Sequence, residues 1–278
     1  MSSISNVGGA SGAGAGARGG LTARSVLLSV LLGADPPRMP VRLLVQTTEL
    51  FGISEGTTRT ALSRMVAAGE VEAVMKDAAV RAYEITAGRL LERQARYTVS
   101  RRGRTHAWHD EWIQAVVGAE GRRTAADRAA LRAMLDAARL AELREGLWLR
   151  PDNLDELPPT GTGELVGSRE LQWFRTVPDG DPVSLAARLW DLPGWARAAD
   201  DLRRRIDTLL APLEAGDRRP LADGFVLSAA VLRHLQTDPL LPAELLPARW
   251  PGDALRHEYD RYDAAWRAVL QDWFRQHQ

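Results

Sequence analysis

The spacing of the apolar residues changes once in the first third of the chain, at Gly69. Before Gly69, apolar residues such as Ala61, Leu62 and Met65 follow the three- and four-residue spacing of a helix. After Gly69, residues alternate in character over 71–75 and again over 80–86, with a charged turn between them. The change therefore predicts a helix followed by a two-stranded hairpin.

Two more helices are expected ahead of this one. Thr22 can cap a helix that runs to Leu32, and Pro40 can open a second helix over 41–51 that Gly52 ends. Ser54 can cap the third helix, which runs through residue 67. Three helices and a hairpin in this order are the outline of a winged helix-turn-helix.

The third helix carries short polar and arginine side chains near its start, as a helix that reads the DNA major groove does. These candidate contacts are Ser54, Thr57, Thr58, Arg59, Ser63 and Arg64. An ordinary solvated helix would have a similar face, and the sequence of the helix alone leaves both interpretations open. The two preceding helices and the hairpin favour DNA binding.

Charge is divided unevenly along the chain. Residues 1–109 carry 14 basic and 8 acidic residues, a net charge of +6, whereas residues 110–278 carry 22 and 28, a net charge of −6. A basic front part is expected to be the part that meets a polyanion. Six arginines at 89, 93, 96, 101, 102 and 104 could grip phosphates, or could belong to a solvated helix and hinge.

The rest of the chain predicts an α+β middle and a helical end. Strands are expected at 112–117, 147–150 and 170–177, with helices at 124–140 and 183–189, an order that fits a ferredoxin-like sandwich. Helices are expected at 195–213, at 222–236 and from 253 to the end. The predicted fold class is α+β, mostly helical. Its predicted parts are a disordered Gly/Ala-rich tail at 1–20, a winged helix at 21–88, a linker helix and hinge at 89–105, a ferredoxin-like domain at 106–192 and a helical domain at 193–278.

Several classes of protein are disfavoured. The chain has no cysteine, no GxSxG and no GxxxxGK[ST], since its one lysine, Lys76, follows Met75. His106 and His109 lie near Asp110 without a third ligand nearby, so no metal, cofactor or enzyme activity is predicted. Tryptophans of the middle segment beside Arg122, Arg123 or Arg150 could hold an aromatic anion, although core packing is the expected use of each ring. No apolar run or leader suggests a membrane, and we expect a cytoplasmic protein.

Seven segments of the chain resemble the PaaX-type transcriptional regulators. They are LTARSVLLSVLLG, ELFGISEGTTRTALSRMVAAGEVEA, GRLLERQ, RRTAADRAAL, LREGLWLRPDNL, LSAAVLRHLQTDPLLPAELLPARWPG and YDRYDAAW, in the order found in that family. The resemblance implies a winged helix, a ferredoxin-like middle and a helical end. It also implies a homodimeric repressor of a catabolic operon that leaves double-stranded operator DNA when it binds an aryl-CoA or acyl-CoA thioester such as phenylacetyl-CoA.

The resemblance places Thr57, Thr58, Arg59, Ser63 and Arg64 on the recognition helix, and it implies wing contacts by Lys76 and Arg81. The wing stretch here, MKDAAVRAYEIT, lacks the glycine that is usual in the family. The residues that would bind the effector are not assigned. Two alternatives stay open: a DNA-binding regulator without a small-molecule effector, and a nucleic-acid-processing enzyme that uses the ferredoxin-like middle.

Overall fold

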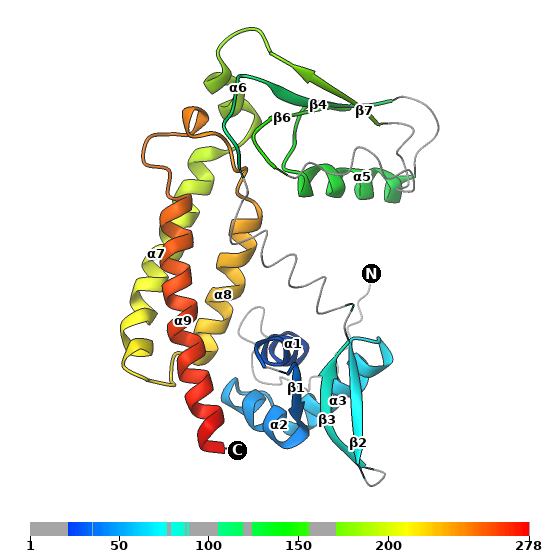
Figure 1. Cartoon of the computed structure of the whole chain (residues 1–278), viewed down its shortest axis with the longest axis vertical. Helices are drawn as coiled ribbons and strands as arrows, with labels where there is room; N and C mark the ends of the chain where they lie inside the picture. The colour runs from blue at the N-terminus through cyan, green and yellow to red at the C-terminus, as the bar shows by residue number, and fades with distance from the viewer. Residues whose placement is uncertain are drawn as a thin grey trace, which may run out of the picture. The chain divides into compact units, whose positions relative to one another are not determined.

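The structure is a computed structural model that describes residues 22–34, 36–76, 79–86, 88, 105–118, 124–155 and 171–277. The chain divides into two compact units, one of residues 1–91 with 274–278 and one of residues 92–273. In the described residues helices predominate, and the strands form two small antiparallel sheets (Figure 1). The predicted α+β, mostly helical class is thereby confirmed.

The first unit begins with the three predicted helices, α1 (Ala23–Gly33), α2 (Val41–Leu50) and α3 (Glu55–Ala67). Thr22 caps α1, because its hydroxyl oxygen accepts the Ser25 N–H at 3.1 Å. Ser54 caps α3 in the same way, accepting the Thr57 N–H at 3.3 Å. The helix starts predicted from these two residues are confirmed.

A three-stranded sheet completes this unit, with strand order β1-β3-β2. The predicted hairpin is formed by β2 (Val71–Lys76) and β3 (Ala79–Ile85). The third strand, β1 (Arg38–Pro40), pairs antiparallel with β3 and was not predicted. Three residues that follow two prolines and end in a third are too short to display an alternating pattern.

The core of the first unit joins all three helices. Val26, Leu27 and Leu31 of α1 are buried with Leu44 of α2 and Leu62 of α3. The inner side of α3 thus packs against the other two helices through these side chains. The opposite side of α3 is thereby left at the surface.

The second unit contains a four-stranded sheet with strand order β5-β6-β4-β7. Its elements in chain order are β4 (Trp112–Val117), α5 (Ala125–Ala137), β5 (Ala141–Arg144), β6 (Leu147–Pro151) and β7 (Leu171–Thr176). Three of the strands and α5 were predicted, but β5 was missed because the helix was extended to Leu140. Arg139 has a φ of 63°, in the left-handed region, and so ends the helical path before β5.

Each face of this sheet has its own apolar cluster. Helix α5 lies along one face (Figure 1), where Ala115 and Trp148 pack with Leu135 and Leu140. On the other face, Trp112 and Leu149 cluster with Ala186 of α6 (Pro182–Leu189). The sheet is therefore a packed layer with large rings on both sides.

Three long helices follow α6. They are α7 (Leu192–Glu214), α8 (Leu221–Gln236) and α9 (Gly252–His277), with a short 3₁₀ helix, η2 (Ala243–Leu245), before α9. All three long helices were predicted, and α7 starts three residues before the predicted Trp195. Asp191 sets that earlier start, since its carboxylate accepts the Gly194 N–H at 2.9 Å.

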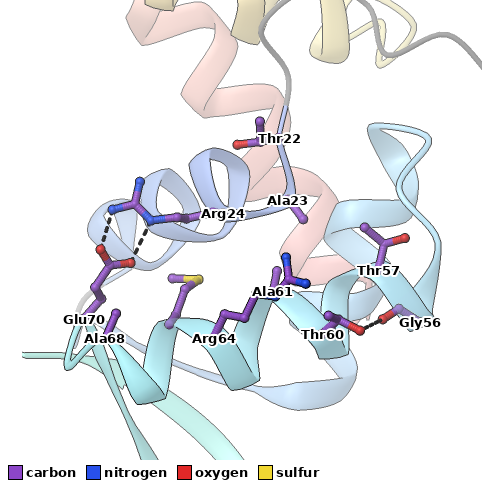
Figure 2. Close-up of a pocket in the computed structure, with 11 residues that line it drawn as sticks. Thr22, Ala23, Arg24, Gly56, Thr57, Thr60, Ala61, Arg64, Ala68 and Glu70 are labelled. Carbon is purple, nitrogen blue, oxygen red and sulfur yellow. Dashed lines mark hydrogen bonds and ion pairs between the residues drawn. The ribbon is translucent and has the colours of Figure 1, made fainter.

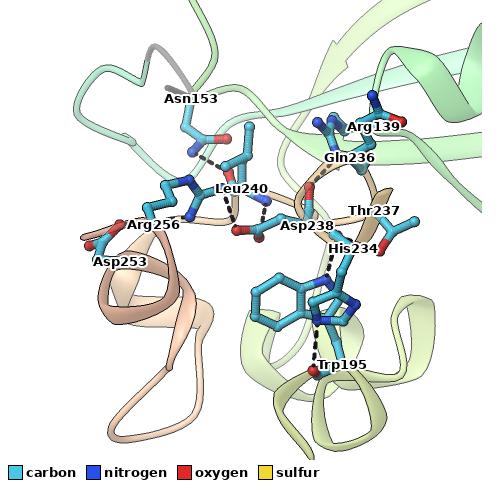
Figure 3. A network of polar contacts seen from close by, with 10 residues as sticks. All are labelled: Arg139, Asn153, Trp195, His234, Gln236, Thr237, Asp238, Leu240, Asp253 and Arg256. Atoms are coloured by element: carbon cyan, nitrogen blue, oxygen red, sulfur yellow. Dashed lines mark hydrogen bonds and ion pairs between the residues drawn. The ribbon is translucent and has the colours of Figure 1, made fainter. Parts of the chain in front are cut away.

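Buried polar contacts tie the sheet region to the turn after α8 (Figure 3). Arg139 donates to the carbonyl oxygens of Gln236 and Asp238, the latter at 2.6 Å. The Asp238 carboxylate accepts from Arg256 at 2.6 Å. The Asn153 amide donates to the Leu240 carbonyl at 2.9 Å. These bonds span distant parts of the second unit and fix its sheet region to its helices.

Some predictions fall outside the described residues. These are the tail at 1–20, most of the helix expected at 86–98, and the hinge at 101–104. The described helices include none that is both long enough and apolar enough to cross a membrane.

Candidate functional site

The outer face of α3 is the main exposed polar surface that the sequence predicted. Thr58, Leu62 and Met65 point inward and are almost fully buried. On the opposite side Gly56, Thr60, Ser63 and Ala67 follow one another at helical spacing and are all exposed. The centre of this outer face therefore consists of small residues, which let another surface approach the helix backbone closely.

Two arginines flank the row of small residues. The Arg59 guanidinium donates to the Glu55 carboxylate at 2.7 Å, and both side chains are more than half exposed. An exposed i,i+4 pair of this kind contributes only about 0.3–0.5 kcal/mol. Glu55 therefore holds Arg59 weakly, and an anion could draw it away. Arg64 lies exposed on the other side of the row.

The placement of Thr58 corrects the sequence analysis, which grouped it with the exposed polar residues. Thr58 is 0 % exposed, and its hydroxyl lies 2.6 Å from that of Thr48 and 3.0 Å from the Ser54 carbonyl oxygen. Its position on the helix is on the inner side, next to Leu62. A polar residue type at a core-facing position misled the prediction, and Thr58 is not part of the outer face.

The outer face continues into a groove of about 610 Å³ between α3 and the start of α1 (Figure 2). Thr57, Thr60 and Arg64 line it from α3, and Thr22 and Arg24 line it from α1. Hydroxyl and guanidinium groups thus border one hollow from two helices. Such groups are the usual donors to phosphate oxygens and to base edges.

Arg24 is held in the groove by Glu70, which follows α3 (Figure 2). Its Nε donates to Oε2 of Glu70 at 2.8 Å, and its Nη2 donates to Oε1. The side-chain hydrogen bond to Glu70 raises the pKa of Arg24 above its ordinary value. Glu70 is 4 % exposed, whereas Arg24 is largely exposed, so this pair anchors a cation at the rim of the groove.

The remaining predicted contacts divide into two groups. Ser54 and Thr57 are exposed at the start of α3, where their hydroxyl oxygens lie 2.9 Å apart. Lys76 ends β2 and Arg81 lies in β3, but their side chains are outside the described residues. The structure therefore brings Ser54, Thr57, Arg59, Ser63 and Arg64 together on one helix and leaves the wing contacts undescribed.

Comparisons with known proteins cover both ends of the chain. The family model described as PaaX-like protein matches residues 22–88, and the model described as PaaX-like protein C-terminal domain matches residues 190–276. The chain belongs to the PaaX-like family. A solved structure, that of the uncharacterized protein Rv0674 from Mycobacterium tuberculosis, is 42 % identical, with a TM-score of 0.68. The match covers 90 % of this chain and 99 % of that one. No curated protein matches the sequence.

The PaaX-like chain has site residues that the sequence analysis missed. Thr60 lies at the centre of the outer face, one helical turn after Gly56, and its hydroxyl donates to the Gly56 carbonyl at 2.9 Å. A helical projection of 55–67 would have found it, three residues from Thr57 and four from Arg64. Arg24 could not be found in this way, because its partner Glu70 lies 46 positions further on.

The middle segment of this PaaX-like protein offers less to a ligand than its residue types suggested. Arg150 is 0 % exposed and donates to the Pro151 carbonyl at 2.9 Å and to the Asn153 side chain at 2.8 Å. Burial lowers the pKa of Arg150 to about 9. This arginine thus serves the fold, which agrees with the core packing expected of this region and leaves Arg150 unavailable to an aromatic anion. Arg122 and Arg123 lie outside the described residues.

His106 has partners other than a metal. Its ring nitrogens lie 3.2 Å from a carboxylate oxygen of Asp155 and 3.1 Å from the Asp152 carbonyl oxygen. In the part of the chain that the structure describes, no three His, Asp or Glu side chains are placed to hold a metal ion.

Proposed function

We propose that this PaaX-like protein is a homodimeric, sequence-specific DNA-binding transcriptional regulator, and that it acts as a repressor. The observation that carries the proposal is the outer face of α3, a row of small residues flanked by Arg59 and Arg64. Family membership supports the same conclusion, since the family that the sequence resembles regulates transcription.

In this proposal residues 21–88 act as a winged helix and α3 enters the major groove. Gly56, Thr60 and Ser63 allow the helix backbone to come close to the base edges. Arg59 and Arg64 reach guanine or phosphate, and Ser54 and Thr57 donate to phosphates near the start of the helix. Lys76 and Arg81 contact the adjacent phosphates from the hairpin. Residues 89–105 act as a linker between the reader and a ferredoxin-like domain at 106–192 with a helical domain at 193–278.

The direct test is to identify DNA that the purified protein retains. Fragmented genomic DNA is passed over the immobilised full chain, and the retained fragments are sequenced and then footprinted. We expect one recurring sequence with two half-sites whose centres lie about 10 base pairs, or a multiple, apart. Retention of all fragments alike would contradict sequence-specific recognition.

We further propose that an acyl-CoA or aryl-CoA thioester releases the protein from its operator. Support for the ligand class comes from the resemblance to phenylacetyl-CoA-responsive repressors. A hollow of about 400 Å³ between α7 and α8 is lined by Arg233, His234 and Thr237 together with Asp201, and it offers one cation and several polar groups on the second unit. A ligand shifts DNA affinity only if its own affinity differs between the conformation that binds DNA and the conformation that does not.

The effector is tested by titrating a panel of CoA thioesters while following operator release. Phenylacetyl-CoA or a related ester is expected to release the DNA, and free CoA is not. A panel without effect at near-millimolar concentration would leave the alternative of a regulator controlled by a protein partner. We also expect the protein to leave DNA intact in the presence of Mg²⁺ or Mn²⁺, because a regulator binds DNA without cleaving it.

A further inference from the structure

The two edges of the four-stranded sheet differ in how they are protected. At one edge β5 is short and carries Glu142 and Arg144, and its register with β6 shifts between these two residues. Short length, charge and a bulge are the features that stop an edge strand from pairing with another chain. The β5 edge is thus closed to further strands.

The β7 edge is longer than the β5 edge and has no bulge. All six residues of β7 pair with β4 in an unbroken register, from Leu171 opposite Val117 to Thr176 opposite Trp112. The strand carries no proline, and its one charge, Arg175, donates to Asp152 of the same chain at 2.9 Å. Among the described strands β7 pairs only with β4, so its outer backbone groups face away from the sheet.

Exposed apolar side chains gather at the same edge. Phe174 of β7 is 46 % exposed, and Val177 directly after the strand is 63 % exposed. They are two of the five large hydrophobic side chains that stand out as exposed in the described residues. An exposed apolar patch beside an open strand edge indicates a protein–protein contact.

The sequence of β7 is complementary to itself. When a strand pairs antiparallel with its own copy, the two strands are related by a two-fold axis perpendicular to the sheet. Each side chain then stays on its own face of the sheet, so the axis must pass between one residue and the same residue of the copy. With the axis at Phe174, Leu171 lies opposite Val177, Gln172 opposite Thr176 and Trp173 opposite Arg175. Apolar residues then face apolar ones, polar residues face polar ones, and the cation faces an aromatic ring.

Neighbouring registers lack this match. With the axis at Arg175, two arginines would face one another, and like charges directly opposite destabilise a sheet. With the axis at Trp173, Phe174 would face the amide of Gln172. The Phe174 register is therefore the one that the charges and the apolar side chains of β7 favour.

We propose that two copies of this chain pair through β7, with Phe174 beside its copy on the two-fold axis, to form one continuous eight-stranded sheet. This inference deepens the proposed function, because it assigns the surface that makes the dimer. The partner is a second copy, since only a second copy supplies a strand with the same self-matching order.

The chain has no cysteine, which permits a clean crosslinking test without DNA. Phe174→Cys places one thiol beside its copy, at a Cβ separation of about 4.5–5.5 Å in an antiparallel pair, close to what a disulfide requires. Mild oxidation is expected to give a disulfide-linked dimer in high yield. Gln172→Cys is the matched control: in the proposed register its copy lies about four residues along the strand, roughly 13 Å away, and it is expected to stay monomeric on a non-reducing gel.

A mixed experiment tests the register itself. Protomers with Gln172→Cys are mixed with protomers with Thr176→Cys, and a crosslinked heterodimer is expected because these positions lie opposite one another. Phe174→Asp is expected to convert the dimer into a monomer in light scattering. Met75→Asp, which changes a more exposed apolar residue on β2, is expected to leave it dimeric.

The outcomes separate this inference from the proposed function. A wild-type dimer that neither crosslinks at position 174 nor dissociates with Phe174→Asp would overturn the β7 interface and leave DNA binding and dimerisation standing. A wild-type monomer that still binds its operator would overturn the interface and the dimer together. Failure of the proposed DNA recognition is read separately, from fragment retention.

Discussion

The hydroxyl oxygens of Thr48 and Thr58 lie 2.6 Å apart in the interior between α2 and α3. Both side chains are fully buried, and each is also within reach of a backbone carbonyl: Val45 at 2.8 Å for Thr48, and Ser54 at 3.0 Å for Thr58. A buried hydroxyl that loses its partner costs about 1–3 kcal/mol. This pair therefore sets how α3 sits on α2.

We expect Thr58→Val to destabilise the first unit by about 1–3 kcal/mol, because it keeps the shape and removes the hydroxyl. All nine tryptophans lie at or after position 108, so tryptophan fluorescence would not report on this unit. Hydrogen exchange of α2 and α3 amides is the suitable measurement. Thr60→Val, an exposed change on the same helix, is the control and should stay within about 0.5 kcal/mol. Equal protection in both variants would contradict the role of the buried pair.

Arg59→Ala and Arg64→Ala are expected to weaken operator binding without unfolding the protein. A contact to a base edge should cost about 1–3 kcal/mol and relax the preference at one position. Loss of a contact to phosphate should weaken binding to all sequences alike, and it should reduce the slope of log Kd against log salt concentration by about one. Gel-shift titrations at several salt concentrations distinguish the two. Arg204→Ala on α7, which removes an arginine that is also paired within its own helix, serves as control.

Glu55→Gln is expected to tighten operator binding. Its carboxylate holds Arg59 at 2.7 Å and lies where α3 would approach phosphates, so its removal frees a cation and removes a repulsive charge. A gain of about 0.5–1 kcal/mol, or about two- to fivefold in Kd, is expected at low salt and should shrink at high salt. Unchanged or weaker binding would place the DNA elsewhere than on the outer face of α3.

The sequence predicted those elements whose signals are local. Thr22 and Ser54 marked helix starts, and the change of period at Gly69 marked the hairpin, because caps and spacing act within a few residues. It missed β1, which is three residues long and pairs with the distant strand β3. It also missed β5, which is four residues long, because the helix before it was extended up to its start. It also misplaced Thr58, since residue type alone does not tell a buried hydroxyl from an exposed one. The Arg24 to Glu70 pair depends on the fold and carries no local signal.

Two glycines in helices should respond in opposite ways to alanine. A Cβ on Gly224 would lie 2.6 Å from the Tyr262 hydroxyl oxygen and 2.8 Å from Cδ1 of Trp266, where α8 meets α9. A Cβ on Gly56 would meet nothing within 4 Å. Alanine is favoured over glycine in a helix by about 1 kcal/mol, so Gly56→Ala should stabilise α3.

Gly224→Ala should instead destabilise the second unit by about 1–3 kcal/mol, because the helices must separate or Trp266 must move. Urea unfolding followed by tryptophan fluorescence measures this change, and hydrogen exchange in α3 measures the effect of Gly56→Ala. A Gly224→Ala variant as stable as the wild type would mean that α8 and α9 can shift apart at little cost.

Stability of the second unit is expected to fall on mild acidification through His234. Its ring stacks on Trp195 with centroids 4.3 Å apart, and Nε2 lies 3.1 Å from the Trp195 carbonyl oxygen. Burial lowers the pKa of His234, against the opposing effects of that carbonyl and of Asp238. The unfolded chain, with an ordinary histidine pKa of about 6.5, then binds the proton more readily than the folded chain. The free energy of unfolding therefore keeps its full value, as far as His234 is concerned, above about pH 6.5, and it declines as the pH falls below that value.

His234→Gln keeps a side chain that can donate to the Trp195 carbonyl and removes the titrating group. Urea midpoints of the wild type should fall more between pH 7 and pH 5.5 than those of the variant, whose remaining decline comes from other groups. The matched control is His257→Gln, the same change at an exposed histidine. Histidine ring NMR supplies an independent reading: the resonance lost in His234→Gln should titrate below pH 6.5 in the folded wild type. Parallel pH profiles for wild type and His234→Gln, with a resonance that titrates at or above pH 6.5, would show that the stacked ring accepts a proton without cost to the fold.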